Sequence, residues 1–129
     1  MVKPDVLEQL AVKGVDINAV ADQLIEDRKQ IPRLVEALQT ERSSKKFAFE
    51  KALRLVSQNQ PGLIYPFFDV FADLLVGENS ILKWGAIITI GHLTVVDKKK
   101  KFEKFVRRQL KNTRKSVAGK AARFIHKYE

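Results

Sequence analysis

The chain has 129 residues, of which 45% are hydrophobic and 30% are charged, and its formal net charge is +9. This balance is typical of a folded globular protein and excludes a chain that is disordered throughout. Cysteine is absent, which excludes disulfides, thiolate zinc sites and thiol catalysis.

Apolar residues recur at intervals of three and four along the whole chain, which predicts helices and no strands. Six of the eight expected helices span residues 4–12, 17–28, 31–39, 81–95, 98–111 and 114–128. The fourth is expected to run from its cap to about residue 58, and the fifth is expected to start near Pro66 and to close at Gly77. Their expected N-caps are Asp16, Ser43 or Ser44, Asn79 or Ser80, Asp97 and Thr113. Gly14 and Gly77 are expected to end helices, and Gln60-Pro61-Gly62 is expected to break the chain.

The helix expected at 81–95 is apolar on nearly every side. Ile81, Trp84, Ile87 and Ile88 lie on one side, and Leu82, Ala86, Ile90 and Leu93 lie on the other. A helix of this kind has to be covered on most of its surface, so we expect it at the centre of the fold. We also expect Trp84 and most of the eight phenylalanines to pack in the core.

A spacing pattern occurs three times in the chain. A lysine is followed by small or apolar residues at positions +3, +6, +7 and +10, which form one face of a helix. The three copies are Lys46, Phe49, Ala52, Leu53 and Val56; Lys83, Ala86, Thr89, Ile90 and Leu93; and Lys115, Ala118, Ala121, Ala122 and Ile125. Copies that begin about 35 residues apart are typical of stacked helical hairpins.

With these residues the chain resembles HEAT-repeat and armadillo-like proteins, in which helical pairs stack into a right-handed solenoid. The resemblance implies an all-α, right-handed α-α superhelix of about four pairs, which together form a single domain over 1–129. The pairs are a divergent one at 4–28 and three more at 31–58, 63–95 and 98–128. HEAT repeats usually carry Arg where these copies have Lys, and they have an Asp in the preceding turn that is missing here.

The residues that could carry chemistry are few and scattered. Neither His92 nor His126 has a second histidine at ligand spacing, and we expect His92 to be buried or half-buried by packing. Asp69 and Asp73 lie one helical turn apart, where a solvent-facing role is the simplest interpretation. Gly85 and Gly91 are expected to permit close helix packing. We therefore predict no catalytic residue, no metal site and no cofactor.

The positive charge is concentrated at the C-terminal end. Residues 1–97 contain 11 Lys and Arg against 13 Asp and Glu, whereas residues 98–129 contain 13 against 2. Several of these cations crowd the start of the helix expected at 98–111, where the helix dipole disfavours positive charge. The predicted contact region for a partner comprises Lys98, Lys99, Lys100, Lys101, Lys104, Arg107, Arg108, Lys111, Lys120, Arg123 and Lys127.

We predict a non-catalytic binding module in the cytoplasm, without membrane insertion, whose partner is an acidic or extended protein segment. The preference for protein follows from the resemblance, since HEAT-like repeats most often bind proteins. Nucleic acid is the alternative, because Lys and Arg neutralise phosphates on any sequence. Some HEAT-like solenoids are DNA glycosylases of alkylated bases, but no catalytic Asp or aromatic pocket can be assigned here. That enzymatic alternative ranks third.

Overall fold

The computed structural model describes residues 5–111, and all of its regular elements are helices. They are α1 (Val6–Leu10), α2 (Ile17–Glu26), α3 (Gln30–Thr40), α4 (Lys45–Asn59), α5 (Pro61–Ile64), α6 (Phe68–Val76), α7 (Ser80–Leu93) and α8 (Lys101–Lys111). Short 3-10 turns at Tyr65–Phe67 and Thr94–Val96 follow α5 and α7. The all-α prediction is confirmed for this part of the chain.

The chain divides into two compact units, Met1–Val96 and Asp97–Glu129, and each is described by itself. The prediction of a single domain over 1–129 stays a prediction. The helix expected at 114–128, with its cap Thr113 and the third copy of the repeated pattern, lies outside the described residues.

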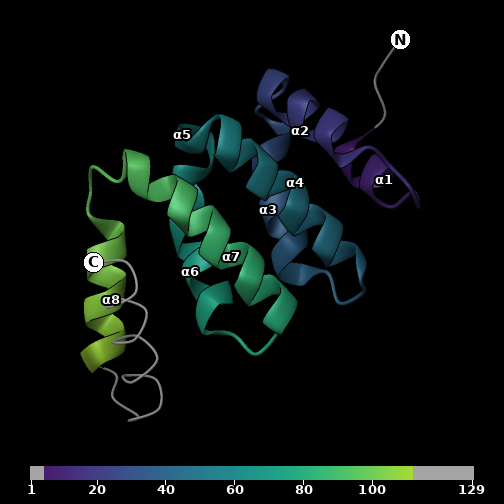
Figure 1. Ribbon diagram of the computed structural model, residues 1–129. Coiled ribbons are helices and arrows are strands. Elements are labelled where there is room, and N and C mark those ends of the chain that lie inside the picture. The colour runs from purple at the N-terminus through teal and green to yellow at the C-terminus, as the bar shows by residue number, and fades with distance from the viewer. Residues whose placement is uncertain (1–4, 112–129) are drawn as a thin grey trace. The chain divides into compact units, whose positions relative to one another are not determined.

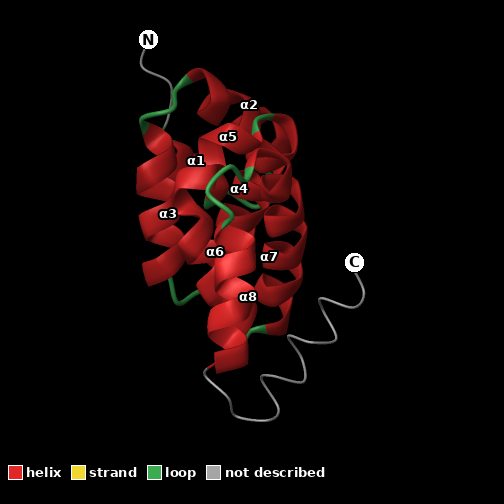
Figure 2. Ribbon diagram, turned by 90° about the vertical axis from the view of Figure 1, so that its left-hand side faces the viewer, coloured by secondary structure: helices red, strands yellow, loops and turns green. Residues whose placement is uncertain are grey.

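The helices of the first unit are arranged as neighbouring pairs. α1 packs against α2, α3 against α4, and α6 against α7, while α4 also lies against both α2 and α7. Figures 1 and 2 show α2, α4 and α7 in one layer, with α3 and α6 behind it. The core lies between these layers and contains Leu24, Leu34, Leu53, Ile64, Phe68, Phe71, Ile90 and Leu93, all almost fully buried.

Most helix boundaries follow the local signals in the sequence. The Asp16 side chain accepts a hydrogen bond from the N–H of Ala19, and Asn79 accepts from those of Ile81 and Leu82, as expected of N-caps. Gly14 has a φ of 80°, in the region that favours glycine, and Gly77 ends α6. The chain breaks at Gln60 as predicted, but Pro61 at once begins the short helix α5, because proline suits a first helical position.

The repeated pattern marks the buried face of both described copies. Phe49, Ala52, Leu53 and Val56 of α4 are buried, and so are Ala86, Thr89, Ile90 and Leu93 of α7. α7 is covered on most of its surface, as expected, since its exposed residues are Ser80, Ile81, Trp84 and Gly91. The prediction that Trp84 packs in the core is wrong, because Trp84 is 64% exposed, and the nearby Ile81 is 59% exposed.

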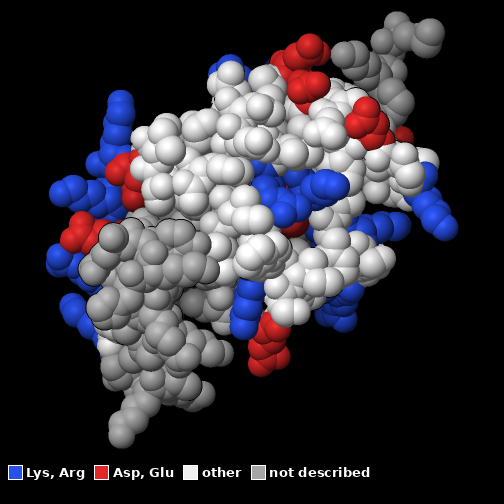
Figure 3. All heavy atoms as spheres, viewed as in Figure 1, with Lys and Arg blue, Asp and Glu red and all other residues white. Residues whose placement is uncertain are grey.

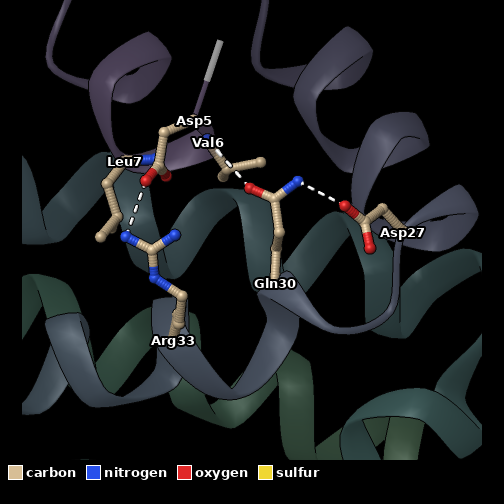
Figure 4. A network of polar contacts seen from close by, with 6 residues as sticks. All are labelled: Asp5, Val6, Leu7, Asp27, Gln30 and Arg33. Carbon is tan, nitrogen blue, oxygen red and sulfur yellow. Dashed lines mark hydrogen bonds and ion pairs between the residues drawn. The ribbon is translucent and has the colours of Figure 1, made fainter. Parts of the chain in front are cut away.

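A polar network at the start of α3 holds the start of α1 (Figure 4). The Gln30 amide accepts a hydrogen bond from the N–H of Val6 at 3.1 Å and donates one to Asp27 at 2.8 Å. Arg33 pairs with Asp5 at 2.6 Å. The N–H of Leu7 and the charge of Arg33 hold the pKa of Asp5 below its ordinary value. A helix of five residues does not persist alone in water, so these contacts and packing stabilise α1.

Replacing Gln30 with Ala is expected to lower the free energy of unfolding by about 1 kcal/mol, because the buried end of α1 loses a hydrogen-bond acceptor. Urea denaturation measures this change, and amide exchange should show the fastest loss of protection in α1. Gln39→Ala, at an exposed position of the same helix, should change stability by less than about 0.5 kcal/mol. Equal effects of the two changes would contradict the role given to Gln30.

Candidate functional site

The basic segment comprises the eight described cations of the predicted contact region: Lys98, Lys99, Lys100, Lys101, Lys104, Arg107, Arg108 and Lys111. Seven of the eight side chains are exposed, and Lys101 is half-buried. The other three predicted contact residues, Lys120, Arg123 and Lys127, lie outside the described residues. The described residues therefore place seven accessible cations between positions 98 and 111.

The first three lysines lie in a turn, and the prediction of a helix from Lys98 is wrong by three residues. Lys100 has a φ of 53°, which ends any helical path through this turn. The Asp97 carboxylate reaches across it and accepts hydrogen bonds from the N–H groups of Lys101 and Phe102, at 2.8 and 3.0 Å. Asp97 thus binds the first N–H groups of α8 from four residues before the helix, and not from the position directly before it that was predicted. Its negative charge offsets part of the cost of the lysines at this helix end.

α8 separates an apolar face from a basic one. Phe105 and Val106 are buried and Phe102 is half-buried, whereas Leu110, on the same face of the helix, is 38% exposed. The basic face carries Lys104, Arg108 and Lys111, spaced by four and three residues so that they form one stripe. Glu103, the one acid within the basic segment, is paired with Arg107 at 2.7 Å.

A second cluster, which the sequence did not lead us to predict, lies where α4 contacts α7. We call it the polar seam; it consists of Glu50, Arg54 and Ser57 on α4 and of Gly85, Thr89 and His92 on α7. On both helices the three residues are spaced by four and then three, so each set forms one stripe. That shared spacing is visible in the sequence and could have indicated the cluster. It is easily overlooked, because Glu50 and Ser57 directly follow the apolar residues Phe49 and Val56, where polar residues at the solvent-exposed border of an amphipathic helix are common.

Glu50 is the charged residue of the polar seam that is most deeply placed. Its side chain is 4% exposed and its nearest cation is Arg54, whose Nε lies 3.5 Å from Oε1. Figure 3 shows basic side chains gathered over α4 on the face that it displays. Burial raises the pKa of Glu50 to about 7, while the charge of Arg54 acts in the opposite direction.

Ser57 and His92 form a hydrogen bond at the other end of the polar seam. The Ser57 hydroxyl donates to the carbonyl of Arg54 at 2.6 Å, so its oxygen accepts from Nδ1 of His92, which is 3.0 Å away. Burial and the charge of Arg54 lower the pKa of His92, which favours the neutral ring. The distance between the Ser57 hydroxyl and His92 would suit a nucleophile and its base. However, Ser57 is completely buried and its proton is donated to the Arg54 carbonyl, so we assign this hydrogen bond a structural role between α4 and α7.

Of the remaining candidates from the sequence, Gly85 belongs to the polar seam and the others lie apart from both clusters. Asp69 and Asp73 are exposed on α6, as expected of a solvent face. Gly85 permits close packing, because a Cβ there would overlap the Glu50 carboxylate, whereas Gly91 is exposed and has open space around it. Residues 5–111 contain no group of three or more His, Cys, Asp or Glu side chains that could hold a metal ion. No helix of this range is both long and apolar enough to cross a membrane.

The described residues define an all-α protein of paired helices, with one exposed basic segment and one polar seam between α4 and α7. Comparisons with protein-family models, with curated proteins and with solved structures found no match.

Proposed function

We propose that the chain is a non-catalytic binding module of the cytoplasm, built as a HEAT-like right-handed stack of helical hairpins, that contacts an acidic protein segment through the basic segment. The observation that carries this proposal is the exposure of seven of its eight cations, with a single acid among them. Like charges three or four residues apart on a helix repel one another by a few tenths of a kcal/mol per pair. A surface that serves only for solvation would do as well with mixed charges.

The helix contacts support the stacked arrangement. Each of α2, α4 and α7 packs against the helix before it in its own pair, and α4 lies between the other two. Glu50 meets Gly85 and Ser57 meets His92, so the same offset of 35 residues relates both contacts. A constant offset means that α4 and α7 run in parallel, as the second helices of neighbouring pairs do in a solenoid.

The spacing of the cations Lys104, Arg108 and Lys111 along α8 matches the spacing of carboxylates on an acidic helix. Lys104 and Lys111 are seven residues apart, which is about 10 Å along a helix. Carboxylates spaced by three and four residues on an acidic helix repeat at the same distance, so several pairs could form together. Single exposed ion pairs contribute about 0–1 kcal/mol, and only a set of them gives useful affinity.

The test is binding of a fluorescein-labelled polyglutamate peptide, measured by anisotropy at low and at physiological salt. We expect binding that weakens as salt rises, and at least tenfold weaker binding by the variant Lys104→Glu, Arg108→Glu, Lys111→Glu. The matched control is Lys13→Glu, Arg28→Glu, Arg42→Glu, which makes the same charge change at exposed positions of the first unit. The control should lower affinity by no more than about twofold.

Equal weakening by the two triple variants would show that net charge alone binds the peptide, and would overturn the proposed surface. A single-stranded oligonucleotide of equal charge is tested in parallel. If it binds more tightly than the peptide, the acidic-protein partner is wrong and the nucleic-acid alternative takes its place.

A further inference from the structure

The contact between Glu50 and Gly85 joins two helices through an acidic side chain. The Glu50 carboxylate fills the space that a side chain at position 85 would need, since a Cβ there would overlap both of its oxygens. Gly85 is itself buried, so the carboxylate is enclosed between α4 and α7. Any change in the charge or hydration of this group therefore acts directly on the packing of the two helices.

The charge of an ionised Glu50 is poorly compensated in this position. Its Oε1 is buried without a hydrogen-bond partner, and so is Oγ1 of Thr89, one turn along α7 from Gly85. Arg54 approaches to 3.5 Å but makes no hydrogen bond to Oε1. An ionised carboxylate in such surroundings loses the water that would otherwise solvate it, whereas the neutral acid loses much less.

The other helices around α4 supply no further compensation. The buried side chains of α1, α2, α3 and α5 are all apolar: Val6, Leu10, Val20, Ala21, Leu24, Ile31, Leu34, Val35, Leu38 and Ile64. The acidic and basic residues on these helices, Glu8, Asp22, Glu26, Arg33 and Glu36, are exposed. α7 carries Lys83, which is half-buried two residues before Gly85, and His92, which is hydrogen-bonded to Ser57. On α4 itself Lys46 is half-buried, and Lys45 and Lys51 are exposed. Among the described residues, Arg54 is the cation whose charge acts on the Glu50 carboxylate.

We propose that the Glu50–Gly85 contact is a proton-sensitive joint, which holds α7 closely on α4 while Glu50 is neutral and loosens when Glu50 ionises. The joint is a conformational device of the first unit and does not depend on the basic segment. Loosening requires only that water reach the carboxylate, for which α4 and α7 need to part by about the width of a water molecule.

The direction of the pH effect follows from the proton affinity of Glu50. Because burial raises the pKa of Glu50 from 4.5 to about 7, the folded state holds the proton more tightly than the unfolded chain. The protonated Glu50 carboxyl group therefore contributes its full stabilisation below pH 4.5, and this stabilisation is lost as the pH rises through 7. His92 acts in the opposite direction, since its lowered pKa costs stability as the pH falls below its ordinary value.

Hydrogen exchange of the α7 amides tests the joint. Between pH 5.5 and pH 8, after correction for intrinsic exchange rates, we expect protection to fall about tenfold in the unchanged protein and less than twofold in Glu50→Gln. Glu36→Gln, at an exposed position of α3, is the matched control and should behave like the unchanged protein. His92 is present in all three proteins, so its own titration cancels in the comparison.

Equal pH dependence in Glu50→Gln and in the unchanged protein would overturn the proposal, and so would constant protection in the unchanged protein. If Glu50→Gln does not fold, the carbon-13 shift of the Glu50 carboxyl group decides. A midpoint between pH 6 and pH 8 supports the joint, and a midpoint below pH 5 refutes it. None of these outcomes depends on peptide binding, so failure here is distinct from failure of the proposed function.

Discussion

Replacing Phe71 with Ala is expected to lower the free energy of unfolding by about 4 kcal/mol, because truncating a buried phenylalanine removes apolar contacts and leaves a cavity. Phe71 is completely buried on α6, the partner of α7 in its pair. Small domains are stable by only about 5–15 kcal/mol, so the variant should retain a small part of the original stability. Urea denaturation followed by circular dichroism measures the difference.

Trp84→Ala is the matched control, since it truncates a larger aromatic side chain on α7. With Trp84 64% exposed, the change should cost less than about 1 kcal/mol. The sequence-based expectation of a buried Trp84 requires about 3–5 kcal/mol instead. A loss of that size in Trp84→Ala would therefore refute the exposed placement of Trp84.

The second large effect is expected for Gly85→Ala, which should cost about 2 kcal/mol because the new Cβ overlaps the Glu50 carboxylate and forces it from its place. The same change at Gly91, in open space on the same helix, should stabilise the protein by up to about 1 kcal/mol, the difference in helix propensity between the two residues.

A double-mutant cycle separates the steric cost from the propensity gain. In a Glu50→Ala background the obstacle is gone, so Gly85→Ala should become stabilising, as it is at Gly91. The change of sign is the diagnostic result, and thermal or urea unfolding of the four proteins measures it. A destabilisation by Gly85→Ala that persists without the Glu50 side chain would show that another contact encloses Gly85.

The sequence predicted the helices of the first unit well, because their signals are local. Asp16 and Asn79 cap helices by hydrogen bonds to N–H groups two or three residues further along the chain, and neighbouring residues suffice to recognise them. The repeated pattern likewise identified the buried face of α4 and of α7, since residues at its spacing share one side of a helix. The start of α8 was placed too early, because nothing in a run of lysines shows that Lys100 adopts a positive φ.

The two candidate sites differ in how far the local sequence reveals them. The basic segment could be predicted because charge and helical spacing can be read directly from the chain, and exposure is the usual state of lysine and arginine. The polar seam could not, since Glu50 resembles a surface residue until Gly85 is placed against it. The two residues are 35 positions apart, and no local pattern relates them.

Local sequence thus determined where most of the helices of the first unit begin and end and which face of each is apolar, because capping and amphipathicity act within a few residues. Only the tertiary structure decided which helix covers which face. It left Trp84 exposed on the side of α7 that α4 and α6 do not reach, and it buried Glu50 where α7 carries a glycine. Burial depends on neighbours brought together from distant parts of the chain, and so does the pKa of a carboxyl group.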